Sequence, residues 1–152
     1  MPPETTTTDG SENSDEPSLG GILIHPITFL GVFGVGFLIA GLVYAVADRP
    51  FTRANARNAL NWHLSVFGLA AVTGGLFVLG HTGIVDGSET VGWSLLPAPI
   101  DAVVGTIGVV FFVLTLVAGL LTIVFSIVAT INAVVGDAWP YPFAPELIER
   151  ES

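Results

Sequence analysis

The chain has 152 residues, of which 51% are hydrophobic and only 11% are charged, and its formal net charge is -9. Soluble domains usually contain about 25% charged residues, so this composition indicates a membrane protein. Four basic residues against thirteen acidic ones exclude nucleic acid as a partner, because a run of phosphates needs many cations. The absence of cysteine excludes disulfides, thiolate metal sites and cysteine nucleophiles.

Residues 1–18 are rich in Pro, Thr, Ser, Glu and Asp and contain almost no apolar side chains. Such a segment cannot bury enough apolar surface to offset the entropy cost of folding, so we predict a disordered acidic tail. The tail lacks the basic region of a signal peptide, and we expect the first apolar span to remain in the protein. The acidic, lysine-free composition is also what we expect of a protein from a high-salt cytoplasm.

Three long stretches contain no Asp, Glu, Lys or Arg: residues 17–47, 58–85 and 102–136. Each is longer than the ~20 residues that a helix needs to cross ~30 Å of hydrocarbon. Because the backbone in lipid must satisfy its own hydrogen bonds, each stretch is expected to be helical. We therefore predict an all-α integral membrane protein with three transmembrane helices, at residues 19–47, 60–80 and 102–135. The third would be about 50 Å long, so four spans remain an alternative.

A basic amphipathic segment, residues 48–59, precedes the second span. Read as a helix, it places Arg53, Arg57 and Asn61 at i, i+4 and i+8, on one helical face. Asn58 lies beside this face. The pattern predicts that these four residues form a contact surface for a partner protein, for anionic headgroups or for the chain's own loops. The alternative is a membrane-surface anchor whose polar groups form interhelical hydrogen bonds.

Amphipathic rings are favoured at membrane interfaces, and four such side chains are predicted to anchor the protein there: Trp62, His63, Trp139 and Tyr141. His25, next to Pro26, is interpreted as an interfacial residue at the start of the first span rather than as a proton-relay site. Residues 136–152 form an aromatic and proline-rich C-terminal segment, in which Pro140 and Pro142 prevent a helix around Tyr141.

The basic residues predict the orientation. Arg49, Arg53 and Arg57 lie in the connection between the first and second spans, which should therefore be cytoplasmic. The connection at residues 81–101 carries only acidic charges and should be extracytoplasmic. With three spans, the N-terminus is outside and the C-terminal segment returns to the cytoplasm, in a multi-pass protein of the cell membrane.

The central sequence carries a recognisable signature. Phe51 leads, after three residues, into the run NARNALNWH, and a second run near the C-terminus reads INAVVGDAWPYP. Both resemble the pattern of a family of small prokaryotic membrane proteins of unknown function. That family is similar to the twenty-kilodalton subunit of the chloroplast inner-envelope import translocon. The resemblance covers residues 22–148 and implies an α-helical multi-span protein, although this chain has His63 where Gln is usual.

Side chains with catalytic, phosphate-binding or metal-ligating spacing cannot be assembled from this sequence. We therefore expect a protein that is not an enzyme and that uses no metal or other cofactor. The favoured hypothesis is a membrane protein that docks a partner through its basic Arg/Asn helix, as a protein-translocation or membrane-assembly component. The alternatives are a small-solute or ion transport component acting as an oligomer, and a purely structural membrane protein. The expected partners are the lipid bilayer and either further copies of the chain or a second membrane protein.

Overall fold

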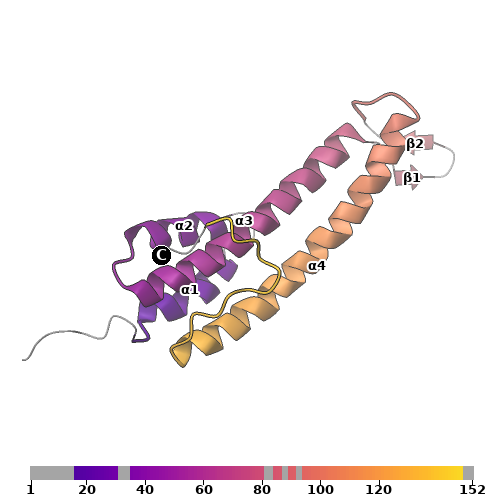
Figure 1. The fold of residues 1–152 in the computed structure, drawn as a ribbon. Helices are drawn as coiled ribbons and strands as arrows, with labels where there is room; N and C mark the ends of the chain where they lie inside the picture. Colours follow the sequence, from indigo (N-terminus) through magenta and orange to yellow (C-terminus); the bar gives the residue numbers. More distant parts are fainter. Residues whose placement is uncertain (1–15, 31–34, 81–83, 87–88, 92–93, 149–152) are drawn as a thin grey trace, which may run out of the picture.

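The computed structural model of the protein describes residues 16–30, 35–80, 84–86, 89–91 and 94–148. Its elements in chain order are α1 (Leu19–Leu30), α2 (Gly36–Val46), α3 (Pro50–Leu79), β1 (Ile84–Asp86), β2 (Glu89–Val91) and α4 (Ile100–Val134). Figure 1 shows α3 and α4 as two long helices side by side, with α1 and α2 along the N-terminal half of α3. The prediction of a helical protein is confirmed, and the two short strands are the exception.

The predicted basic segment and second span form one continuous helix, α3. Pro50 begins this helix, at a position where its missing N–H costs no helical hydrogen bond and its fixed φ favours the helix. At the other end the N–H of Gly80 donates to the Leu76 carbonyl at 2.8 Å. The 30 residues of α3 give a length of about 45 Å, so one rigid element carries both the arginines and an apolar half.

α4 runs antiparallel to α3. At the end of the pair far from the arginines, Gly80 contacts the backbone of Gly105, and glycine permits this close approach. At the arginine-bearing end, Trp62 of α3 bonds Thr122 of α4. Among the described residues, α3 and α4 are the two helices that are long and apolar enough to cross a membrane.

The predicted connection at residues 81–101 contains the two strands. β1 pairs antiparallel with β2, and Ile84 stands opposite Val91. Figure 1 shows this pair of strands at the end of the α3–α4 pair that lies away from α1 and α2.

Two short helices occupy the region of the predicted first span, residues 19–47. α1 has 12 residues and α2 has 11. Each is therefore about 17 Å long, well short of ~30 Å of hydrocarbon. Residues 31–34 between them lie outside the described residues, as do residues 1–15 of the predicted disordered tail. A third continuous span is thus not confirmed.

Small side chains allow the helices to pack closely around the N-terminal half of α3. Five alanines are completely buried: Ala40, Ala56, Ala59, Ala129 and Ala133. One hydrophobic cluster joins α1, α2 and α3 through residues such as Ile24 and Leu60. A second joins α3, α4 and the C-terminal segment through Trp62, Phe125 and Tyr141. The outer face of α4, in contrast, exposes many apolar side chains, as contact with lipid requires.

Gly36 tests the packing of α2. A Cβ there would lie 2.7 Å from the Thr28 carbonyl oxygen and would overlap the His63 ring. Because a backbone carbonyl and a buried ring cannot easily move, we expect Gly36→Ala to destabilise the detergent-solubilised protein by about 1–3 kcal/mol in thermal unfolding. Gly74→Ala is the matched control, since no atom lies within 4 Å of a Cβ at Gly74. Equal stability of the two variants would contradict the described packing.

Candidate functional site: a buried polar network and an arginine pocket

A buried histidine joins three separate parts of the chain. The His25 Nδ1 atom of α1 lies 2.8 Å from the Tyr141 hydroxyl of the C-terminal segment. Its Nε2 atom lies 2.8 Å from Asn55 Oδ1 of α3. The Asn55 amide in turn donates to the Phe51 carbonyl at 3.0 Å. His25 and Asn55 are completely buried and Tyr141 is 4% exposed, so these bonds form away from solvent.

The direction of each bond follows from the Asn55 amide. Because its Nδ2 donates to Phe51, its Oδ1 accepts the N–H of His25 Nε2. A neutral His25 then presents Nδ1 as an acceptor, and the Tyr141 hydroxyl donates to it. Burial raises the pKa of the Tyr141 phenol, which keeps the hydroxyl protonated as this bond requires. The network is therefore satisfied without any ionised group.

α4 bonds to the same region. The Ser126 hydroxyl donates to the His25 carbonyl at 2.9 Å, and the Trp62 indole N–H donates to the Thr122 hydroxyl at 2.9 Å. The Trp62 ring meets the Phe125 ring edge-on, with centroids 4.9 Å apart. All five residues are buried, so losing the Thr122 hydroxyl would leave the Trp62 N–H unpaired away from solvent.

Three of the four predicted interface anchors lie inside the protein. Trp62 and Tyr141 belong to the packed region described above, and His63 donates from Nδ1 to the Ala59 carbonyl at 2.8 Å. Only Trp139 is half-buried, with its ring edge-on to Phe125. Burial corrects the interpretation of Trp62, His63 and Tyr141 as membrane-surface anchors, because protein rather than lipid headgroups surrounds their rings. The same correction applies to the predicted interfacial position of His25.

Two of the four predicted contact residues hold the chain's own C-terminal segment. The Asn58 amide donates to the Ala138 carbonyl at 3.1 Å. Asn61 forms a two-way pair with the backbone of Ile148: its Nδ2 donates to the carbonyl at 3.3 Å, and the Ile148 N–H donates to its Oδ1 at 2.9 Å. Both asparagines are buried. The segment after α4 therefore lies over α3, as Figure 1 shows.

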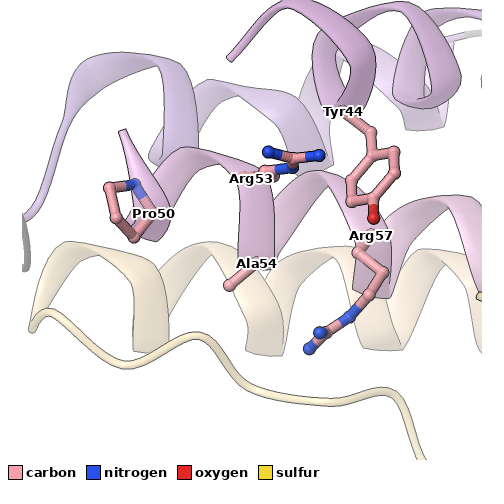
Figure 2. Close-up of a pocket in the computed structure, with 5 residues that line it drawn as sticks. All are labelled: Tyr44, Pro50, Arg53, Ala54 and Arg57. Carbon is pink, nitrogen blue, oxygen red and sulfur yellow. The ribbon is translucent and has the colours of Figure 1, made fainter. Parts of the chain in front are cut away.

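The other two predicted contact residues, Arg53 and Arg57, line a pocket of about 180 Å³. Tyr44 of α2 and Pro50 and Ala54 of α3 complete its wall (Figure 2). The Arg53 guanidinium carbon lies 5.0 Å from the centre of the Tyr44 ring, a cation–π geometry. We call this site the arginine pocket. It lies beside the start of α3, on the same helix as the asparagines but outside the buried network.

The first turn of α3 adds to the positive potential of the arginine pocket. Pro50 begins the helix, and no acidic residue lies in its first turn. The N–H groups of a helix N-terminus carry a partial positive charge that favours anions. Arg53 and Arg57, one helical turn apart on α3, place two cationic side chains at the arginine pocket, and guanidinium groups bind carboxylates and phosphates.

A metal centre has no support in the part of the chain that the structure describes, where no group of three His, Asp or Glu side chains is suitably placed.

Sequence reasoning missed the joint role of His25, Asn55 and Tyr141. Asn55 and Tyr141 stand in the two runs that carry the family resemblance, which was the available signal, whereas His25 stands outside both runs. Their pairing depends on the packing of three distant segments, which no spacing reveals.

The chain belongs to the magnetosome magnetite crystal formation protein family, MamF/MmsF, because the model of that family matches residues 16–148. This membership, together with the apolar helices α3 and α4, indicates a membrane protein, as the composition predicts. No curated protein and no solved structure matches the chain. The relation to a chloroplast translocon subunit, which the central motif suggested, is therefore not shown.

Tyr141 tests the buried network. Tyr141→Phe keeps the ring and removes the hydroxyl, which leaves His25 Nδ1 as a buried acceptor without its donor. We expect a loss of about 1–3 kcal/mol in thermal stability, the cost of an unsatisfied buried group. The control is Tyr44→Phe, because Tyr44 is half-buried and its hydroxyl has no hydrogen bond among the described residues. The network would be contradicted by equal losses in the two variants.

Asn61 tests the attachment of the C-terminal segment. Asn61→Ala removes both bonds to Ile148, so we expect faster hydrogen exchange of the Ile148 amide and faster proteolysis within residues 142–148. Asn132→Ala is the matched control, since the Asn132 amide bonds within α4, to Val128. Unchanged exchange at Ile148 in Asn61→Ala would mean that the asparagine does not hold the segment.

Proposed function

We propose that this member of the MamF/MmsF family is a non-enzymatic membrane protein that docks a partner protein through the arginine pocket. The observation that supports the proposal is the position of Arg53 and Arg57 on α3, where both line the arginine pocket beside Tyr44 of α2. A chain with only four basic residues thus places two of them around one hollow.

The chemistry of the arginine pocket favours an acidic side chain as the docking group. Guanidinium groups bind carboxylates through paired N–H donors, and such charge-assisted bonds are stronger than neutral ones. The Tyr44 ring stacks near Arg53 and limits the positions that its guanidinium can take. An acidic segment of a second membrane protein, lying at the membrane surface, has the charge and the reach for this site.

A protein partner is preferred to diffuse attraction by anionic lipids. The composition predicts a high-salt cytoplasm, and at about 1 M salt the Debye length falls to about 3 Å. Long-range attraction to headgroups is then screened, whereas close hydrogen-bonded contacts persist. The pocket supplies close contacts, because its arginines lie beside a wall formed by α2 and α3.

The proposed biological role is the assembly of proteins at a membrane. The arginine connection and the C-terminal segment would face the cytoplasm, in keeping with the preference of arginine for that side. Within a family described by magnetite crystal formation, recruiting a partner to the membrane is the role that this pocket supports. Protein translocation is one form that such assembly could take.

A transport component acting as an oligomer is the second candidate. One observation favours it: a Cβ added at Gly68, Gly74 or Gly75 of α3 would meet nothing within 4 Å. Small residues on a lipid-facing surface let membrane helices approach one another closely. Solute flux into vesicles that contain only this protein would favour transport over docking.

Photocrosslinking in native membranes tests the docking proposal. A photoreactive residue at Ala54 lies in the wall of the arginine pocket, whereas one at Ala70 lies on the exposed apolar half of α3. We expect a distinct protein adduct at Ala54 only. We expect Arg57→Glu to reduce its yield about tenfold, the effect of losing about 1.4 kcal/mol of binding. Arg57→Lys keeps the charge and should retain part of the yield.

Two results would contradict docking through this pocket. One is lipid adducts alone at both positions. The other is a protein adduct at Ala54 whose yield does not change in Arg57→Glu, provided that the variant unfolds at the same temperature as the parent protein.

A further inference from the structure

Contacts with α3 show which part of that helix α1 lies beside. At its start, a Cβ on Gly20 would lie 3.3 Å from Thr52 Cγ2. In its middle, His25 bonds Asn55. α1 therefore begins level with the first turn of α3 and runs in the same direction as α3.

α2 returns along the same part of α3. Its first residue, Gly36, lies against the His63 ring and the Thr28 carbonyl. Gly41 lies beside Leu60, and Tyr44 lies over Arg53. α2 thus runs antiparallel to α3 and ends level with the first turn of α3, the level at which α1 began.

The residues just before α1 lie near the start of α3 and near the end of α4. The Ser18 and Thr52 hydroxyls lie 2.6 Å apart. A Cβ on Gly136, after the end of α4, would lie 3.2 Å from the Pro17 ring. Residues 17–18, the start of α3 and the end of α4 are therefore at one end of the molecule.

We infer that α1 and α2 form a re-entrant hairpin, which enters the membrane from the arginine-bearing side and returns to that side. The chain then crosses the membrane twice, through α3 and α4. At about 17 Å, each short helix is too short to cross ~30 Å of hydrocarbon.

The side chains of the hairpin suit this position. Its outward face is apolar, with Leu23, Ile27, Leu38 and Leu42 each 42–65% exposed. Its inward face carries His25 and Thr28, which are completely buried and bonded within the protein. Polar groups at membrane depth require such internal partners, and re-entrant segments are tolerated where protein encloses them.

The hairpin changes the expected topology. With three spans, the N-terminal tail and the arginines lie on opposite sides of the membrane. With the re-entrant hairpin, the acidic tail, the arginine pocket and the C-terminal segment share one face, and the connection between α3 and α4 is alone on the other. This inference stands on packing and does not depend on the docking proposal.

A cysteine crosslink separates the two topologies, since the natural chain contains no cysteine. In native membranes we expect Ser18→Cys with Thr52→Cys to form a disulfide under mild oxidation, because their hydroxyls are in contact. Ser18→Cys with Ser94→Cys is the control and should not react. If residues 19–47 were one continuous span, residue 18 would lie about 40 Å from residue 48, and the first pair would not react either.

Accessibility to a membrane-impermeant maleimide gives a second test. We expect Ser88→Cys to react from one side of the membrane and both Ser11→Cys and Ser152→Cys from the other, whichever side is cytoplasmic. Reaction of Ser11→Cys on the same side as Ser88→Cys, with no Ser18–Thr52 disulfide, would overturn the hairpin. Neither test requires a partner protein, so the failure of either would not change the interpretation of the crosslinking result at Ala54.

Discussion

The position of His25 between Asn55 and Tyr141 is the constraint on which the rest of the structure depends. His25 is completely buried and both of its ring nitrogens have hydrogen-bond partners, which offsets the cost of removing them from water. Its partners come from α3 and from the C-terminal segment, and its carbonyl accepts from α4. One residue thereby fixes the relative positions of four segments. Closely packed alanines on α3 and α4 make the necessary approach possible.

This constraint explains the composition of the central run, NARNALNWH. Asn55 bonds His25, whereas Asn58 and Asn61 bond the backbone of the C-terminal segment. Ala56 and Ala59 are completely buried at the crossing of the helices. The run is therefore primarily structural, and its outward contribution comes from Arg57 together with the preceding Arg53. The chemistry that Arg53 and Arg57 offer for recognition is electrostatic.

The two ends of the molecule differ in packing and in polarity. The arginine-bearing end combines five packed segments, a polar network and the arginine pocket. Beyond His63, α3 and α4 continue largely as a pair, with many apolar side chains exposed. Stability is thus concentrated where the polar groups are paired, and the apolar pair has the length and composition to cross a membrane. A site for partners is expected at the rigid end, where its arginines are held by neighbouring helices.

The sequence by itself determined the membrane class, the helical fold and the helix that carries Arg53 and Arg57. Composition and uninterrupted apolar length suffice for these, because the bilayer imposes them on any chain. Only the tertiary structure decided that Trp62, His63 and Tyr141 are internal and that Asn58 and Asn61 hold the C-terminal segment. It also decided that two short helices occupy the first apolar stretch. Helical periodicity shows which residues share one face of a helix, but not which residues of other segments contact that face. His25 meets partners 30 and 116 residues away, a pairing that only packing can specify.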